Sequence, residues 1–192
     1  MRQDFSHVTA EDLARLFPVL LAEHDPEWKE AYLEQEAYLR SVFGEKLARI
    51  GHIGSTAVPG LAAKPTVDIL LEVPKGVDLA PYTRRMLDAG YVVNHPSSDL
   101  IMYLKGYTPE GFRGQAFHIH ARYLGDWDEP YFRDYLIAHP EAAAEYARLK
   151  RALKERFPFD RDGYTEAKGA FVKRCTALGR AEFPGKYDVA ER

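Results

Sequence analysis

The sequence has a single cysteine, Cys175, and no long apolar run. One cysteine excludes an internal disulfide and any metal site built from several cysteines, and it is typical of a reducing compartment. Because no stretch of about 18 consecutive apolar residues occurs, we expect no membrane-spanning helix. Residues 1–5 also lack an apolar signal core. These absences together predict a cytoplasmic protein with no membrane partner.

The chain also carries little net charge, −3 over 192 residues. Nothing therefore indicates a protein-wide nucleic-acid interface, although a local basic patch stays open. Apolar side chains make up 46% of the residues, which is enough for a hydrophobic core and argues against global disorder. The length fits one domain, spanning 1–192. The oligomeric state is left open.

Helix and strand signals divide the chain into a sheet-forming part, 24–125, and a helical part, 126–182. Two capped helices are expected first, one from Thr9 that ends near Pro18 and one from Asp25 to Phe43 that ends at Gly44. Strands are then expected at 47–53, 67–73, 91–93, 101–104 and 115–124, and helices at 78–89, 129–138, 140–157 and 164–178. Residues 94–99 read as a polar turn, and 105–114, with three glycines and a proline, as a mobile loop. This order predicts an α+β fold, a mixed β-sheet with flanking helices and a helical C-terminal third.

The most informative stretch is the loop at 54–65, which lies between two expected strands. Gly54 lets backbone amides approach an anion closely, and Ser55 adds a hydroxyl donor. Lys64, near the end of the loop, can neutralise a phosphate. The loop therefore predicts an anion site, while an ordinary strand-to-loop turn with an exposed lysine remains the alternative.

The strand after this loop carries two acids. Side chains in a strand repeat every two residues, so Asp68, Leu70 and Glu72 share one face. Magnesium prefers oxygen ligands and often takes one or two protein carboxylates while phosphates supply the rest. The pattern predicts a metal site here. Asp68 paired with an arginine, or Glu72 solvated at the strand end, stays open as an alternative.

Two histidines occupy a later strand. His118 and His120 point the same way, about 7 Å apart along the strand. Imidazoles bind metals, hold phosphates and exchange protons near neutral pH, although a solvated strand face is the simpler explanation. His52 shares a strand with the entry to the loop at 54–65. Lys168 lies within an expected helix, where we expect a solvated position.

Several of these segments together identify a family resemblance. The stretch from His52 to Ile69, HIGSTAVPGLAAKPTVDI, closely resembles the signature of the GrpB family. Residues 25–28 resemble its N-terminal motif, 118–120 its His-x-His strand, and 132–140 and 164–168 parts of its helical segments. The resemblance runs over 24–180, nearly the whole chain.

The resemblance implies a nucleotidyltransferase-like fold of the DNA polymerase beta superfamily. That pattern is Gly-Ser, then Asp-x-Asp or Asp-x-Glu on the next strand, with a third acid later. Here Asp68 follows at a suitable gap, but Leu70 holds the second acid position and cannot bind a metal. Glu72, His118 and His120 are the remaining candidate ligands. Gly51 also departs from the family, which usually has glutamate before the histidine.

The activity implied is metal-assisted transfer of a nucleotidyl group from a nucleoside triphosphate to an unknown acceptor, with Mg²⁺ or Mn²⁺ as cofactor. The catalytic candidates are Asp68, His118 and His120, and the metal-ligand candidates are Asp68, Glu72, His118 and His120. The candidates for binding nucleotide or phosphate are His52, Gly54, Ser55, Thr56, Lys64 and Lys168. Two alternatives stay open. One is a non-catalytic module that binds a nucleotide or a coenzyme A-related ligand, because some members resemble a domain fused to dephospho-CoA kinase. The other is a metal-dependent phosphohydrolase that uses the His-x-His strand.

Overall fold

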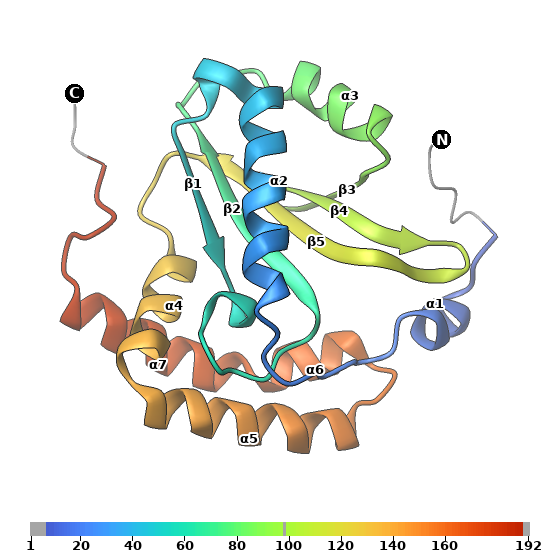
Figure 1. Ribbon diagram of the computed structural model, residues 1–192, viewed down its shortest axis with the longest axis vertical. Helices are drawn as coiled ribbons and strands as arrows, with labels where there is room; N and C mark the ends of the chain where they lie inside the picture. Colours follow the sequence, from blue (N-terminus) through green and yellow to red (C-terminus); the bar gives the residue numbers. More distant parts are fainter. Residues whose placement is uncertain (1–6, 98, 190–192) are drawn as a thin grey trace.

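A computed structural model describes residues 7–97 and 99–189 of the chain (Figure 1). Its five strands form one mixed sheet in the order β1-β2-β5-β4-β3. The strands are β1 (Arg49–Ile53), β2 (Thr66–Val73), β3 (Val92–Ser97), β4 (Leu100–Thr108) and β5 (Gly111–Tyr123). The helices are α1 (Ala10–Leu16), α2 (Glu27–Phe43), α3 (Ala80–Asp88), α4 (Asp128–Ala138), α5 (Pro140–Arg156), α6 (Arg161–Ala167) and α7 (Gly169–Glu182). Two 3-10 turns, η1 (Gly44–Lys46) and η2 (Ser55–Ala57), flank β1.

The sheet is built around β2, which pairs antiparallel with β1 and parallel with β5. A strand buried on both faces reads as a continuous apolar run, and TVDILLEV is such a run apart from its two acids. In the parallel pair, Asp68 lies opposite His118 and Leu70 lies opposite His120. The register therefore brings the two motifs predicted to carry chemistry onto neighbouring strands.

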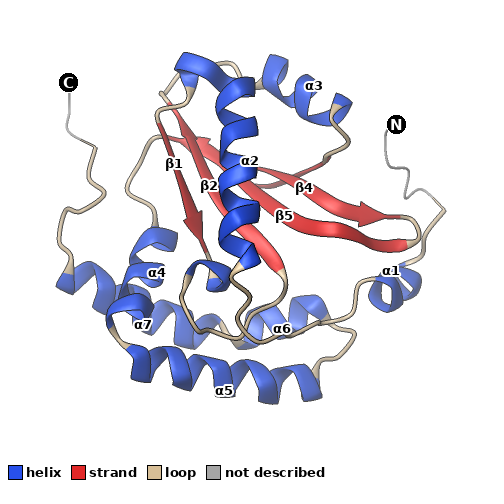
Figure 2. Ribbon diagram, viewed as in Figure 1, coloured by secondary structure: helices blue, strands red, loops and turns tan. Residues whose placement is uncertain are grey.

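The main hydrophobic core lies between one face of the sheet and α2, which crosses that face (Figure 2). It is formed by the residues of β2 and β5 that alternate with the acids and histidines, by Trp28, Tyr32 and Leu39 of α2, and by Met86 of α3. Since side chains alternate along a strand, Asp68, His118 and His120 point to the opposite face. The polar positions of β2 and β5 thus remain available for a site.

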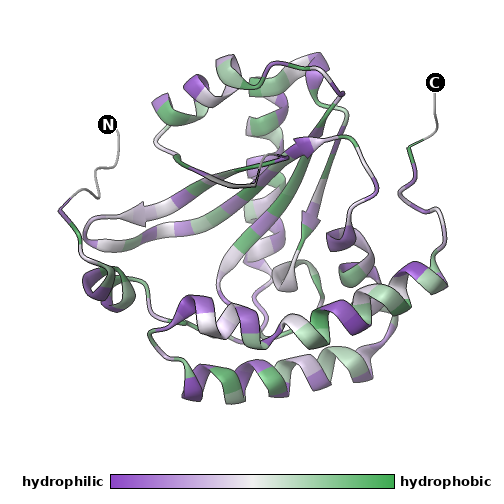
Figure 3. Cartoon of the chain, turned by 180° about the vertical axis from the view of Figure 1, so that it is seen from behind, coloured by the Kyte–Doolittle hydropathy of each residue, from purple (hydrophilic) through white to green (hydrophobic). Residues whose placement is uncertain are grey.

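The C-terminal helices carry the second core. Side chains of α4, α5 and α7 pack there around Val58 and Leu61, which belong to the loop at 54–65. In Figure 3 these helices alternate hydrophilic and hydrophobic residues, as expected for helices with one buried face. The helical part therefore fixes the position of the loop that carries Gly54 and Ser55. Over the described stretches, every helix is too short or too polar to cross a bilayer.

The predicted α+β class and its helical C-terminal third are confirmed. Thr9 caps α1 with a reciprocal capping box, and Gly44 ends α2 with a φ of 55°. An isolated antiparallel bridge between Ala22 and Ala63 joins the segment before α2 to the loop at 54–65.

Three expectations of local structure are wrong. The stretch 105–114 is a hairpin of β4 and β5, not a mobile loop. Gly106, with a φ of 86°, lies where the register shifts, and a Cβ there would stand 2.8 Å from backbone atoms of the neighbouring strand. The glycine that resembled a loop signal thus allows a β-bulge.

The second error concerns the turn predicted at 94–99. Strand β3 extends to Ser97, so the turn begins later; Ser98 lies outside the described residues.

The third error concerns the last helix, predicted as one element over 164–178. The structure has two helices, α6 and α7, that meet at Lys168. Gly169 follows this residue, and glycine weakens the continuation of a helix. The joint places Lys168 in a partly buried position, where we had expected a solvated helix face.

Candidate functional site

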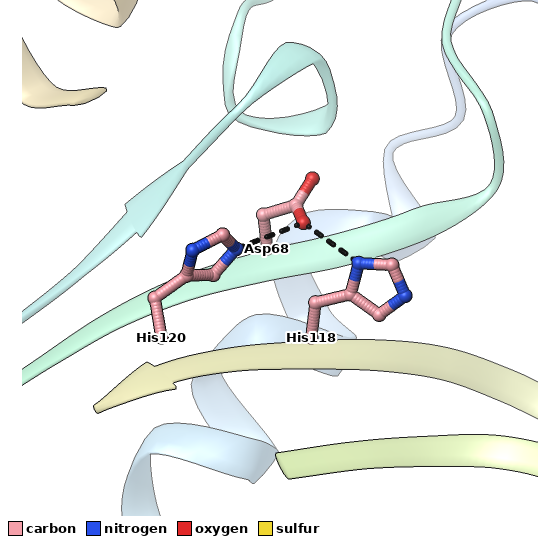
Figure 4. A group of neighbouring side chains, drawn as sticks. All are labelled: Asp68, His118 and His120. Carbon is pink, nitrogen blue, oxygen red and sulfur yellow. Dashed lines mark hydrogen bonds and ion pairs between the residues drawn. The ribbon is translucent and has the colours of Figure 1, made fainter. Parts of the chain in front are cut away.

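Three side chains from two neighbouring strands meet on the face of the sheet opposite α2 (Figure 4). The Oδ1 atom of Asp68 lies 3.3 Å from Nδ1 of His118 and 3.4 Å from Nε2 of His120. One potential ligand atom from each residue lies within 4.8 Å of the others. A carboxylate and two imidazoles at this separation can hold one divalent metal ion, and such a donor set suits Mn²⁺, Zn²⁺ or Fe²⁺ better than Mg²⁺.

The environment keeps Asp68 ionised. Burial by itself raises the pKa of this carboxyl, but the hydrogen bonds from His118 and His120 outweigh burial and hold the pKa well below its usual range. A carboxylate that stays charged is available as a metal ligand at any pH near neutrality.

Gly54 packs directly against this carboxylate. Its φ is 70°, and a Cβ at this position would stand 2.6 Å from Oδ2 of Asp68. Both the backbone conformation and the approach require glycine. The Gly-Ser turn predicted from the sequence therefore has a specific geometric role, which is to bring the loop backbone onto the carboxylate of Asp68.

A cavity of about 750 Å³ opens over this group of side chains. Its wall includes Gly54, Ser55 and four cationic side chains, Lys64, Lys150, Arg161 and Lys168. Burial is the main cause that lowers the pKa of Lys150 to about 7 and that of Lys64 to about 8, and it also lowers the pKa of Lys168. Repulsion among the cations adds to this effect, with Lys168 acting on both Lys150 and Lys64. An anion in the cavity would relieve that repulsion.

Lys150 joins α5 to the Gly-Ser loop. It is 2% exposed, and its Nζ donates hydrogen bonds to Oγ of Ser55 at 3.0 Å and to the carbonyl of Ala62. Lys150 was not among the site residues predicted from the sequence. A signal was present, however, because α5 repeats small and apolar residues at helical spacing, and Lys150 falls on that stripe. A lysine on the apolar face of a helix either destabilises the fold or has a buried hydrogen-bond partner.

Tyr107 and Arg161 form a hydrogen-bonded chain that orients His118. The hydroxyl of Tyr107 lies 2.7 Å from Nε2 of His118, and Nη2 of Arg161 donates to the same hydroxyl at 3.1 Å. Tyr107 also stacks on the imidazole with ring centroids 5.7 Å apart. No sequence signal pointed to Tyr107 or Arg161, because one lies in the hairpin that was read as a loop and the other precedes the misread helix.

Two of the predicted phosphate-binding residues are instead internal. His52 stacks on Tyr32 of α2, and its Nε2 lies 2.9 Å from Oγ1 of Thr56. Thr56 uses its hydroxyl proton for the carbonyl of Thr66, so His52 is the donor in their hydrogen bond. Burial lowers the pKa of His52 to about 4, which keeps the ring neutral. Both side chains support the loop from inside, and neither lines the cavity.

Glu72 also departs from its predicted role as a metal ligand. It is 0% exposed, and both its oxygens accept hydrogen bonds from the guanidinium of Arg49. The backbone N–H of Gly125 donates to it at 3.1 Å. Glu72 points to the same face as Asp68 but lies a further strand repeat beyond Leu70, where these partners occupy it. The structure thus brings together Asp68, His118 and His120 and leaves Glu72 out.

Comparison with known proteins gives the family. Residues 18–178 match the sequence model described as GrpB protein, so the chain belongs to the GrpB family. It is 38% identical over 160 residues to the UPF0157 protein PA4798 of Pseudomonas aeruginosa, covering 82% of this chain and 65% of that protein. It is 35% identical over 162 residues to the glutamate-rich protein GrpB of Alkalihalophilus pseudofirmus, covering 80% of this chain and 91% of that one.

A solved structure supports the same assignment. The crystal structure of the conserved protein GrpB from Enterococcus faecalis superposes with a TM-score of 0.74 at 28% identity, covering 85% of this chain and 99% of that chain. A more distant relative is named dephospho-CoA kinase, from Mycolicibacterium paratuberculosis. The match is 28% identical over 191 residues and covers 85% of this chain but 46% of that protein.

Proposed function

We propose that this GrpB protein binds a nucleoside triphosphate in the cavity and, with a divalent metal ion, transfers its nucleotidyl group to an acceptor that carries a hydroxyl. The observation that carries this proposal is the position of four basic side chains in the same cavity as the Asp68–His118–His120 group. A phosphorylated substrate needs both features, because cations hold the phosphate oxygens while a metal offsets the charge that develops during transfer. The distant relationship to a protein named dephospho-CoA kinase further supports a phosphorylated small molecule as ligand.

Each residue then has a defined task. Lys64, Lys168 and Arg161 contact the phosphate chain from the cavity wall. Gly54 exposes the loop backbone beside Asp68, so that its amides can approach an anion. Lys150 of α5 holds Ser55 in place through its hydrogen bond to the serine hydroxyl. The loop and the lysines together orient the substrate, and much of the rate enhancement of phosphoryl chemistry comes from such positioning.

The metal would be held by Asp68, His118 and His120. Bound there, it would supply Lewis-acid polarisation of a phosphate oxygen. The two imidazoles favour Mn²⁺ over Mg²⁺ among the cofactors expected from the sequence.

A second candidate is a metal-dependent phosphohydrolase, with water in place of the acceptor. The histidine-rich donor set favours it, because imidazole ligands suit metals that activate water at neutral pH. Hydrolysis would use the same cavity and the same metal ligands as nucleotidyl transfer. Only the products distinguish the two reactions, since a transferase leaves pyrophosphate and a nucleotidylated acceptor.

The test is isothermal titration of ATP, GTP, CTP and UTP, with and without Mn²⁺ or Mg²⁺. It would use the wild type, Asp68→Ala, and Asp88→Asn as a matched control, because Asp88 is an exposed acid on α3 outside the cavity. We expect nucleotide binding that strengthens with Mn²⁺, that disappears in Asp68→Ala and that persists in Asp88→Asn. Binding that ignores both the metal and Asp68 would instead support a nucleotide-binding module without catalysis. No binding of any nucleotide would overturn the proposal.

A further inference from the structure

The two histidines of the site face Asp68 with different ring nitrogens. His118 presents Nδ1 to Oδ1 of Asp68, whereas His120 presents Nε2 to the same oxygen. The second nitrogen of His118 is occupied by Tyr107, but Nδ1 of His120 is buried without a hydrogen-bond partner among the described residues. His118 therefore has a partner at both ring nitrogens, whereas His120 has one at Nε2 alone.

The hydrogen-bond donors determine where His118 carries its proton. Arg161 can only donate, so the Tyr107 oxygen accepts from it and directs its own proton to another partner. That partner is Nε2 of His118, at 2.7 Å. A neutral imidazole carries one N–H, so His118 then bears its proton on Nδ1, where it faces the carboxylate of Asp68. In this form Nδ1 has no lone pair for a metal.

Metal binding requires the opposite arrangement. Nδ1 must lose its proton to offer a lone pair, and the neutral ring then carries the proton on Nε2, from which it donates to Tyr107. Arg161 and His118 would in that case both donate to one phenol oxygen, and the Tyr107 proton would have to turn away. An anion that draws the Arg161 guanidinium toward the cavity removes this competition.

We propose that Tyr107 is a positioning residue that links the two halves of the site, so that an anion held by Arg161 strengthens the binding of metal at His118. The three groups form one continuous chain from the cationic wall of the cavity to the metal ligands. The preferred ligand is then a metal ion together with a phosphate-bearing molecule, because each promotes the binding of the other. This inference rests on the metal site of the proposed function.

The first test needs no metal. Side-chain ¹⁵N NMR of the metal-free protein reports which nitrogen of His118 is protonated. We expect Nδ1–H in the wild type and a measurable share of the Nε2–H form in Tyr107→Phe, where the carboxylate of Asp68 alone still favours Nδ1–H. Tyr164→Phe is the matched control, because it removes a buried hydroxyl that lines the same cavity and has no hydrogen-bond partner among the described residues. An unchanged His118 signal in Tyr107→Phe overturns the inference.

The second test measures coupling. Mn²⁺ affinity is determined by titration with and without sulfate, a tetrahedral dianion that chelates Mn²⁺ only weakly. For the wild type and Tyr164→Phe, we expect sulfate to tighten Mn²⁺ binding about fivefold or more, the lower end of typical couplings between sites. For Tyr107→Phe, we expect Mn²⁺ binding about tenfold weaker, as is usual when a partner of a metal-ligating histidine is lost, and a sulfate effect below about twofold.

These outcomes separate the two proposals. If the wild type binds Mn²⁺ and Tyr107→Phe keeps both its affinity and its sulfate effect, the inference about Tyr107 is wrong while the metal site stands. If the wild type binds no Mn²⁺, the proposed function fails, and the NMR experiment alone decides whether Tyr107 sets the proton position of His118.

Discussion

Gly54 and Asp68 lie so close that position 54 has no room for a side chain. A Cβ there would stand 2.6 Å from Oδ2 of Asp68 and 3.1 Å from its Cβ. Gly54 begins the loop at 54–65 and Asp68 lies in β2 just after it, so their contact closes the loop over the carboxylate of Asp68. The loop and this carboxylate are therefore a single unit, and a change in one must displace the other.

Gly54→Ala should consequently impair metal binding without touching a ligand. The new methyl group must push the Asp68 carboxylate aside, so we expect Mn²⁺ affinity to fall at least tenfold, on the order of the loss seen when groups that orient metal ligands are changed. Titration with Mn²⁺ measures this. Gly60→Ala is the control, because Gly60 has a similar φ of 75° in the same loop but nothing within 4 Å of an added Cβ. Equal losses in both variants would show that backbone strain, not contact with Asp68, is responsible.

Glu72→Gln should affect stability and leave the metal site intact. Glu72 is fully buried against Arg49, and removing one partner of a buried ion pair leaves the other uncompensated. We expect the free energy of unfolding to fall by about 3 kcal/mol in urea denaturation. Mn²⁺ affinity should match that of the wild type.

Glu11→Gln provides the comparison for this change. Glu11 and Arg15 form a surface pair with both side chains mostly exposed. Such pairs contribute about 1 kcal/mol or less. A loss of Mn²⁺ binding in Glu72→Gln would restore Glu72 as a functional acid and contradict the role that the structure gives it.

The sequence predicted those features that depend on local pattern. Alternation along β5 placed His118 and His120 on one face, and the acid on β2 was recognised because an ionisable residue interrupts an apolar run. Thr9, which caps α1, and Gly44, which ends α2, were equally readable, since caps are local. The class of fold followed from the order of these elements.

Features that depend on tertiary contact could not be read in the same way. Glu72 and Asp68 look alike in sequence, and only the approach of Arg49 from β1 distinguishes them. Lys150 lies 95 residues after Ser55, and nothing near either residue reveals their hydrogen bond. Gly106 resembled a loop glycine because a bulge and a loop use the same conformational freedom.

Lys150→Met should alter the pH dependence of stability. Burial, with the charges of Lys168, Arg151 and Lys64, lowers the pKa of Lys150 from 10.5 to about 7. Between these two values the unfolded chain binds a proton that the folded chain does not, so the free energy of unfolding rises with pH. This contribution amounts to about 1.4 kcal/mol per pH unit, and the variant lacks it.

Urea unfolding of both proteins at pH 7, 8 and 9 measures the effect. The wild type should gain stability relative to Lys150→Met at each step, whatever constant cost the lost hydrogen bonds to Ser55 and Ala62 add. Lys173→Met is the control, because Lys173 is exposed on α7 and should give a difference that does not change with pH. If the difference in unfolding free energy between the wild type and Lys150→Met also does not change with pH, Lys150 is charged in the folded protein.

Leu70→Asp decides whether the site lacks a second acid or is complete with its histidines. The substitution would give β2 the Asp-x-Asp pattern that is typical of nucleotidyltransferases. In the structure, however, Leu70 is 2% exposed and lies in register with His120, which is already turned to Asp68. A carboxylate here would be buried, so we expect the free energy of unfolding to fall by about 3 kcal/mol or more and Mn²⁺ affinity not to rise.

Leu70→Asn separates charge from shape in this experiment, because it introduces a polar group of the same size without the negative charge. If the histidines complete the site, both variants should bind Mn²⁺ no better than the wild type, and Leu70→Asp should be the less stable of the two. Tighter Mn²⁺ binding by Leu70→Asp than by both Leu70→Asn and the wild type would show that the histidines do not complete the site. The site would then be a carboxylate pair that has lost one member, with His118 and His120 as substitutes, and the preference for Mn²⁺ over Mg²⁺ should weaken when the acid is returned.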